Sequence, residues 1–187
     1  PQSAWIGWKQ YGLSVMAAVQ NQNEQTSHYP QAWVRADSGI AAAFLDDDPS
    51  TDPLSAMNGL TSCHTAWLDP NGMLLPIGHL IGLGYVQSEG WPDEIDSLSG
   101  IIHEYFSNES SIPGPDSPYF GPSGAIRCLS EGAGQVAFST ESAVDESCNN
   151  DGPENNEVWC LDIDQYVSIS AFGYLPSTSV VYNPSTL

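Results

Sequence analysis

The stretch SCHTAWLDPNGMLLPIG, residues 62–78, places a cysteine, a histidine and a threonine side by side ahead of a turn-like DPNG segment. A mostly apolar run follows, and Pro76 lies close enough to its start to fit the first turn of a helix. The amino end of a helix attracts anions, because its first backbone N–H groups lack partners within the helix. The stretch therefore has two interpretations: a metal or anion site at a helix start, or a disulfide anchor beside a turn.

The chain has 187 residues, of which 41% are hydrophobic, so it is long and apolar enough for one domain with a substantial core. Its charge is strongly unbalanced. There are 23 acidic residues against 3 basic ones (Lys9, Arg35 and Arg127), for a formal net charge of -20. Such a surface repels nucleic acid and anionic membranes and attracts cations or basic proteins. We therefore expect no nucleic-acid partner.

Four cysteines, Cys63, Cys128, Cys148 and Cys160, form an even set, and none belongs to a CxxC pair. This pattern argues against a structural zinc site and favours two disulfides in an oxidising compartment. No apolar run reaches the length of about eighteen residues that a membrane span requires, so we expect no membrane insertion. One glycosylation acceptor, Asn108, stands in an Asn-Glu-Ser triplet. These features indicate an extracellular protein, or one of the secretory lumen.

Apolar periodicity predicts helices between strands, and hence an α/β sheet protein. The clearest helix covers residues 93–107, where Ile95, Leu98, Ile102 and Phe106 share one face. Other helices are expected at residues 38–48, 72–86 and 125–134, the last after a proline-rich loop at residues 110–124. Strands are expected from residue 32 and at residues 135–140, 157–163 and 179–183, with a strand or short helix at residues 11–19.

Three stretches together resemble motifs of the transferrin family. Residues 62–78 resemble its SCHT motif with the later G, P and G; residues 119–138, YFGPSGAIRCLSEGAGQVAF, resemble YFGYSGAxxCLxxGAGDVAF; and residues 158–181 resemble LLCLD…EY…VPSHTVV. The resemblance extends from about residue 28 to residue 182. It implies a mixed sheet flanked by helices, the type-2 periplasmic-binding-protein-like subdomain of one transferrin lobe, over residues 28–187. Residues 1–27 are an unmatched N-terminal segment, which we expect to join the same globular unit.

The resemblance also implies a metal site whose ligands can be compared with this chain. In transferrins, Fe(III) lies between two subdomains and is held by two tyrosines, an aspartate, a histidine and a bidentate carbonate, since hard Fe(III) favours oxygen ligands. Tyr29 matches the first tyrosine, although a shift of one residue would place His28 there. Pro122 stands at the second tyrosine and Thr178 at the histidine, and neither supplies a phenolate or an imidazole. The aspartate belongs to the sister subdomain.

The carbonate-binding part of the pattern is also altered. The family holds carbonate with a threonine, a helix start and an arginine, and here the arginine position is Asp69. Only Thr65 and the backbone amides of Asn71 and Gly72 persist. An aspartate repels carbonate where an arginine attracts it, so we expect the Fe(III)-carbonate site to be lost.

The resemblance further implies a disulfide between Cys63 and Cys128. Cys160 matches a family half-cystine whose usual partner position is Ser170 here, so Cys148 is its expected partner. The intervening loop is rich in oxygen-bearing side chains, which leaves Ca2+ binding open, with Asp145, Asp151 and Glu154 as candidate ligands. The Asp46–Asp48 cluster is open to the same interpretation.

These observations favour a secreted acidic module without the iron site, acting as a structural or interaction component of an extracellular assembly. Its expected partners are other extracellular proteins or copies of itself. Two alternatives remain open: iron(III) binding by altered ligands, namely Tyr29, Tyr119 and Asp69, and a Ca2+- or mineral-interacting matrix protein. The chain has no GxSxG motif, and HEYF lacks the second histidine of HExxH, so we do not expect an enzyme.

Overall fold

The chain divides into two compact units, Pro1–Tyr29 with Gly173–Leu187, and Pro30–Phe172. The computed structural model describes residues 14–18, 27–45, 48, 50–87, 94–110, 112–148, 158–173, 175–176 and 179–184. Each unit is described by itself below. The sequence-based division at residue 28 stays a prediction.

The first unit contains two antiparallel strand pairs that bring together the two ends of the chain. Strand β1 (Ser14–Ala18) pairs with β8 (Ser179–Tyr182), and β2 (Ser27–His28) pairs with β7 (Leu175–Pro176). The strand expected at residues 179–183 is therefore confirmed, and residues 14–18 adopt the strand of the two structures left open there.

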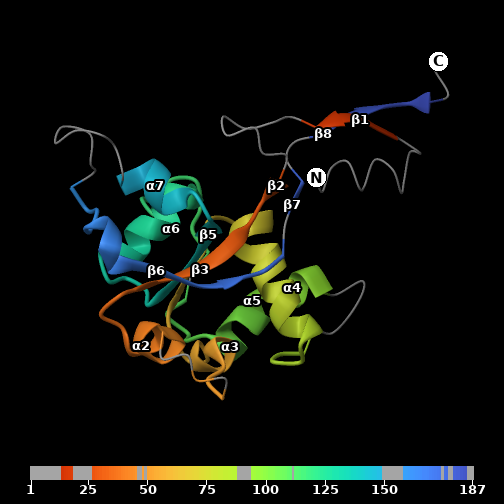
Figure 1. The fold of residues 1–187 in the computed structure, drawn as a ribbon. Coiled ribbons are helices and arrows are strands. Elements are labelled where there is room, and N and C mark those ends of the chain that lie inside the picture. Colours follow the sequence, from red (N-terminus) through yellow and green to blue (C-terminus); the bar gives the residue numbers. More distant parts are fainter. Residues whose placement is uncertain are drawn as a thin grey trace. The chain divides into compact units, whose positions relative to one another are not determined.

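The second unit is built on a four-stranded sheet in the order β4-β5-β3-β6 (Figure 1). Its strands are β3 (Pro30–Arg35), β4 (Ser62–Cys63), β5 (Val136–Thr140) and β6 (Tyr166–Ala171). Strand β5 runs parallel to β4 and antiparallel to β3, which is antiparallel to β6 as well. The sheet is therefore mixed, and with the helices around it the expected α/β fold class is confirmed.

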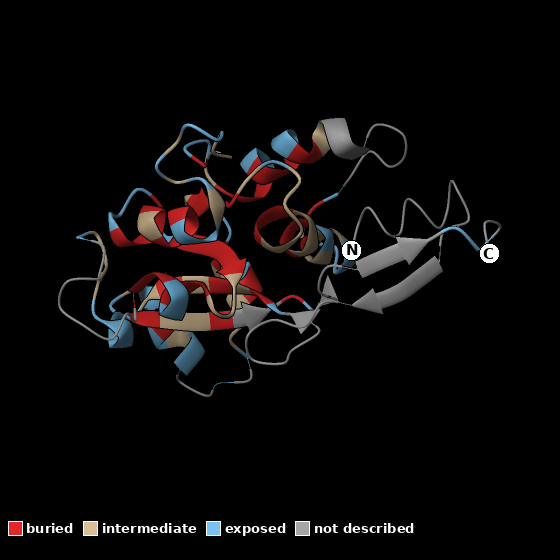
Figure 2. Ribbon diagram, turned by 90° about the horizontal axis from the view of Figure 1, so that it is seen from above, coloured by how far each residue is buried: buried red, intermediate tan, exposed pale blue. Residues whose placement is uncertain are grey.

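Side chains alternate between the two faces of this sheet, as the period of an extended strand requires. Val34 and Phe138 face one hydrophobic cluster, whereas Trp33 and Ala137, one residue away on the same strands, face the other. Because both faces are covered, β5 is buried from Val136 to Ser139 and reads as a continuous apolar run. Figure 2 shows the buried strands between more exposed helices.

Six helices of the second unit flank this sheet, together with one π-helical and one 3-10 turn, among the residues described. Their bounds are α2 (Gly39–Leu45), α3 (Pro53–Ala56), the π turn (Pro70–Leu74), α4 (Leu75–Gly82), α5 (Glu94–Tyr105), α6 (Gly121–Ser130), α7 (Ala143–Cys148) and the 3-10 turn (Ile163–Gln165). Helices α6 and α7 contribute to the Trp33 face, and the others, except the 3-10 turn, contribute to the Phe138 face. None of the helices described is long and apolar enough to cross a membrane.

The amphipathic helix predicted at residues 93–107 corresponds to α5, and Leu98, Ile102 and Phe106 are all buried. Two other predictions were wrong. Residues 158–163 are not a strand, because the disulfide of Cys160 holds this segment at α7, and Val158 is fully exposed there. The strand of this region lies later, at β6.

The proline-rich loop also ends earlier than expected, because α6 begins at Gly121 rather than near residue 125. Pro122 occupies the first turn of the helix, where a missing N–H costs nothing. Close packing then requires glycine at residue 124, since a Cβ there would lie 2.2 Å from the backbone carbonyl carbon of Tyr119. The Gly-Pro-Ser-Gly run is thus a helix start packed against its own approach segment.

Candidate functional site

The segment Thr65–Gly72, here called the anion loop, connects the end of β4 to the π turn and α4. Leu68 adopts a left-handed backbone conformation with φ 56°, which costs a non-glycine residue roughly 1 kcal/mol. Its N–H lies 3.2 Å from the sulfur of Met73. Asp69 follows as the N-cap residue and Pro70 begins the first turn. The positive φ of Leu68 thus lies directly before the residue whose side chain caps the helical turn.

The Asp69 carboxylate occupies the centre of the anion loop. Its Oδ1 accepts hydrogen bonds from Thr65 Oγ1 at 2.8 Å, from the Asn71 N–H at 3.0 Å and from the Gly72 N–H at 2.7 Å. These are the hydroxyl and the two backbone amides that the sequence analysis predicted as the remaining anion donors. Hydrogen bonds to a charged group are about twice as strong as neutral ones. The three donors are therefore satisfied by an anion that belongs to the chain.

Gly72 makes this close geometry possible. A Cβ at this position would lie 2.0 Å from Thr65 Oγ1 and 2.6 Å from Thr65 Cβ. Any larger residue would therefore push the threonine hydroxyl away from the Asp69 carboxylate. The side of the loop that carries the amides and the side that carries the hydroxyl are packed directly against each other.

His64 fixes the carbonyl side of the same loop. Its Nδ1 lies 2.8 Å from the Gly72 carbonyl oxygen, which can only accept, so Nδ1 carries the hydrogen. The other nitrogen, Nε2, lies 2.9 Å from Ser62 Oγ and accepts from it. The ring stacks on Phe138 at 5.4 Å, and burial lowers the pKa of His64 from 6.5 to about 4. His64 is thus a neutral structural residue that ties β4 to the anion loop.

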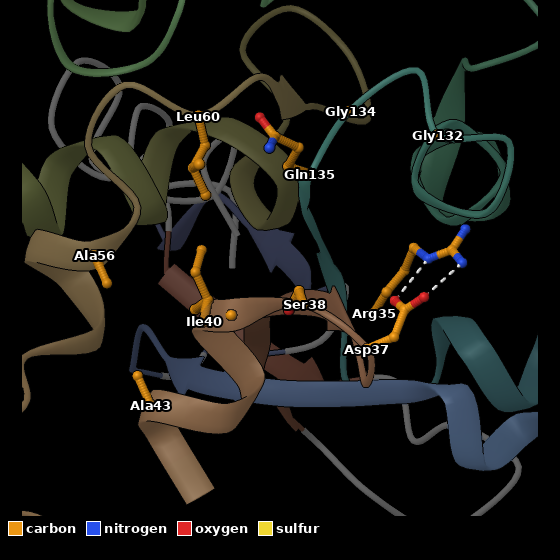
Figure 3. Close-up of a pocket in the computed structure, with 11 residues that line it drawn as sticks. Arg35, Asp37, Ser38, Ile40, Ala43, Ala56, Leu60, Gly132, Gly134 and Gln135 are labelled. Carbon is orange, nitrogen blue, oxygen red and sulfur yellow. Dashed lines mark hydrogen bonds and ion pairs between the residues drawn. The ribbon is translucent and has the colours of Figure 1, made fainter.

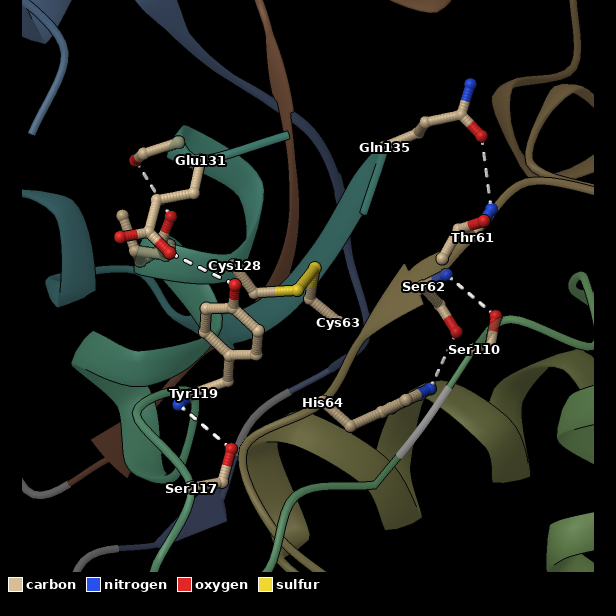
Figure 4. Close-up of a disulfide and its surroundings, with 12 residues drawn as sticks. Thr61, Ser62, Cys63, His64, Ser110, Ser117, Tyr119, Cys128, Glu131 and Gln135 are labelled. Atoms are coloured by element: carbon tan, nitrogen blue, oxygen red, sulfur yellow. Dashed lines mark hydrogen bonds between the residues drawn. A yellow bond between two sulfur atoms is a disulfide. The ribbon is translucent and has the colours of Figure 1, made fainter. Parts of the chain in front are cut away.

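The cysteine of the motif is a disulfide anchor. Cys63 at the end of β4 is bonded to Cys128 in α6, the pairing that the family resemblance implied. Figure 4 shows this bond beside the contacts that hold β4: Ser62 N–H donates to Ser110 Oγ at 2.8 Å, and Thr61 N–H donates to Gln135 Oε1 at 3.2 Å. The motif at residues 62–78 therefore combines a disulfide anchor at Cys63 with an anion loop whose donors are satisfied by Asp69.

One of the predicted metal-ligand positions, Pro122, adjoins the anion loop, because the N–H of the preceding Gly121 donates to the Thr65 carbonyl oxygen at 2.7 Å. Pro122 lies exposed at the start of α6, and its carbonyl accepts from Ser139 Oγ at 3.2 Å. Tyr29 belongs to the first unit and is 43% exposed. Thr178 and the side chain of His28 lie outside the described residues. Tyr29 as a metal ligand stays a prediction.

Tyr119, the second tyrosine of the altered-ligand alternative, is already engaged. Its hydroxyl donates to Glu131 Oε2 at 3.0 Å, while Arg127 Nε donates to Glu131 Oε1 at 3.0 Å. The hydrogen bond to the Glu131 carboxylate raises the pKa of Tyr119 above its usual value. A phenolate, the form that binds Fe(III), is therefore harder to generate here than on an ordinary tyrosine.

The calcium candidates are only partly within the described residues. Asp145 lies exposed in the first turn of α7, whereas Asp151 and Glu154 lie outside the described residues, as do Asp46 and Asp47. Cys148 is bonded to Cys160, as expected. In the part of the chain that the structure describes, no three His, Cys, Asp or Glu side chains gather as a metal-binding group.

A cavity of about 610 Å³ lies where β3 ends and where the chain enters β4 and β5, whereas the anion loop follows the end of β4 (Figure 3 shows the cavity). It opens near the end of β3 and the approach to β5, and its wall includes Ile40, Leu60 and Gln135. Arg35 lines it but is paired with Asp37, with Nε 3.1 Å from Oδ1 and a terminal nitrogen 3.0 Å from Oδ2. No sequence pattern indicated this cavity, because its lining comes from segments far apart in the chain.

Comparison with known proteins shows which family this chain resembles. The family model named Transferrin matches residues 113–181. Ovotransferrin of Gallus gallus is 32% identical, over 57% of this chain and 17% of its own length. Serotransferrin of Bos taurus is 30% identical, over 75% of this chain and 21% of its own length. Melanotransferrin of Homo sapiens is 29% identical, over 87% of this chain and 23% of its own length.

The chain thus spans about a fifth of the length of these curated relatives. The matched region includes the disulfide-linked helix α6, strand β5 and strand β6. Motif order, the mixed α/β sheet and the relatives all agree, and the chain belongs to the transferrin family.

Proposed function

We propose that this chain is a secreted, acidic transferrin-family module that does not form the family's Fe(III)-carbonate site and serves as a structural or protein-interaction component of an extracellular assembly. The observation that carries the proposal is the Asp69 carboxylate on Thr65 Oγ1 and the Asn71 and Gly72 amides. These donors would otherwise hold carbonate, and carbonate completes the coordination of iron in the family.

Electrostatics add to this occupancy. A carbonate placed next to Asp69 would meet a negative charge at close range, and two unit charges about 4 Å apart repel by about 4 kcal/mol at an effective dielectric near 20. The wider surface opposes anions too, with a formal net charge of -20. Hydrogen bonds and charge therefore act in the same direction, against a dissolved anion in the loop.

The disulfides and the acidic surface of the module support the interaction role. Its two disulfides stabilise it outside the reducing cytosol. Its acidic surface favours association with basic proteins and accelerates their encounter at low salt. The acidic fold is thus kept, while Pro122, Thr178 and Asp69 stand where the family pattern has its second tyrosine, its histidine and its arginine.

We expect no stoichiometric iron binding when Fe(III)-nitrilotriacetate and bicarbonate are titrated into the protein. Isothermal titration should show no binding heat beyond dilution, and the mixture should lack the phenolate-to-iron charge-transfer band. A transferrin with the full ligand set, run in parallel, controls for the iron stock. A band with one iron per chain would contradict the proposal and make Tyr29 the first residue to mutate.

Removal of the Asp69 carboxylate should reopen the anion loop. We expect Asp69→Ala to lower the free energy of unfolding by about 2 kcal/mol, because a charged N-cap and its three donors are lost. The same variant should gain stability from added sulfate or bicarbonate, since the donors can then bind a dissolved anion. Thermal melting with and without each anion measures both effects.

Asp69→Asn is the matched control for this experiment. Its amide oxygen can still accept from the loop donors and fills the same space, so an added anion should not restore stability. If wild-type protein is stabilised by bicarbonate as strongly as Asp69→Ala, the loop is open in the native chain and the proposal fails.

A further inference from the structure

A second cavity, of about 490 Å³, lies beside the turn that carries the glycosylation acceptor Asn108. Roughly 300–1,000 Å³ is usual for pockets that bind small molecules. The described residues that give this cavity its character are Trp67, Ser99, His103, Asn108, Glu109 and Ile112. Trp67 belongs to the anion loop, but the hydrogen bonds to the Asp69 carboxylate do not involve it, so the proposed function does not account for this cavity.

We propose that this cavity holds the first sugar of an N-linked glycan attached to Asn108, stacked on the exposed ring of Trp67. The inference goes beyond the proposed function but rests on the extracellular location stated there. Asn108 is one of the residues that line the cavity, so a sugar attached to its side chain would start at the cavity wall. The occupant is therefore identified by its point of attachment.

The acceptor triplet is exposed at Asn108, where the sugar attaches, and buried at Ser110, which the glycan-transferring enzyme must contact. Asn108 is exposed in the turn after α5. Ser110 is only 2% exposed, and its hydroxyl accepts the Ser62 N–H at 2.8 Å (Figure 4). Glycan transfer needs access to this hydroxyl. The sugar is therefore added before β4 and residues 107–110 come together, and the folded chain then closes around it.

The lining suits a neutral sugar. Trp67 is 46% exposed, which is unusual for so large an aromatic ring, and offers an apolar surface to the C–H face of a pyranose. Ser99, His103 and Glu109 supply hydroxyl, imidazole and carboxylate groups that can pair with sugar hydroxyls. A neutral ligand is not repelled by the net charge of -20. Attachment also raises its local concentration, so weak contacts suffice.

The test uses the full chain secreted from eukaryotic cells. Mass spectrometry of the peptide that contains Asn108 should show a glycan, and Asn108→Gln should remove it. Endoglycosidase H is then used to leave one N-acetylglucosamine. The acetyl methyl resonance of that sugar should move upfield through the ring current of Trp67 and show a nuclear Overhauser contact to its indole protons. Protein that retains this sugar should melt about 2–4 °C above protein treated with PNGase F, which leaves aspartate at residue 108, and above Asn108→Gln, which adds no charge there.

Trp67→Ala should abolish the upfield shift, the Overhauser contact and the melting difference. Phe120→Ala is the matched control, since Phe120 is 43% exposed and is not among the residues that line this cavity, so all three signals should persist. An unmodified Asn108 in secreted protein, or an acetyl methyl resonance at the position of a free glycan, would overturn the proposal. Either result would leave the iron titration and the proposed function untouched.

Discussion

Replacing Cys63 and Cys128 together by alanine is expected to lower the free energy of unfolding by about 4 kcal/mol. The bond closes a loop with a sequence separation of 65, so its loss frees a large part of the unfolded chain. Both residues are buried in the cluster on the Trp33 face, so the paired alanines also leave a small space there. Urea unfolding followed by tryptophan fluorescence measures the change.

The second disulfide provides the control for this prediction. Cys148 and Cys160 are separated by only 12 residues, and the same loop-entropy estimate gives about 3 kcal/mol for their paired replacement by alanine. The long loop should therefore lose more than the short one. A larger loss for the Cys148–Cys160 pair would show that local packing at α7, rather than chain entropy, controls the stability that these bonds provide.

Acidification should destabilise the protein through His64. In the folded chain its pKa is about 4, because burial opposes the charged form, against 6.5 for an exposed histidine. The unfolded chain therefore binds a proton near pH 6.5 that the folded chain does not bind until near pH 4. Stability is complete above pH 6.5 and falls as the pH drops between these values. The loss from pH 7 to pH 4 should reach about 3 kcal/mol.

His64→Gln isolates this contribution, because glutamine can form hydrogen bonds but does not titrate. The variant is expected to be less stable at pH 7 and to show a smaller further loss down to pH 4. Asp37, Asp48 and Asp52 also have lowered pKa values, chiefly through side-chain hydrogen bonds, and act at lower pH in both proteins. Equal pH dependence of the two proteins would show that His64 is hydrated in the folded state.

The sequence located the anion loop but not what fills it. The negative charge of an aspartate at residue 69 was enough to predict that it repels carbonate. Its carboxylate accepts from the Thr65 hydroxyl in a loop where Leu68 has a positive φ, a conformation that residue preference does not predict for leucine. One local signal was present, since an aspartate directly before a proline is a common helix N-cap.

The fold could be predicted where local pattern and packing agree. Helix α5 follows its apolar period, and β5 follows its run of buried residues. The secondary-structure prediction failed where a bond to another part of the chain determines the conformation. The apolar segment at residues 158–163 resembles a strand, but the bond to Cys148 removes Cys160 from the sheet, and β6 takes the position beside β3. Whether such an apolar segment becomes a strand depends on which other segment it contacts in the folded chain.

The Asp69 carboxylate also changes how the anion loop responds to its surroundings. A dissolved anion obeys mass action, so its occupancy rises and falls with its concentration. A carboxylate held in position by the chain acts at an effective molarity that no dissolved anion can match. The presence of this carboxylate beside the three donors therefore does not depend on the concentration of a dissolved anion. A carrier depends on a site that can be filled and emptied, whereas these three donors already pair with a carboxylate of the chain itself.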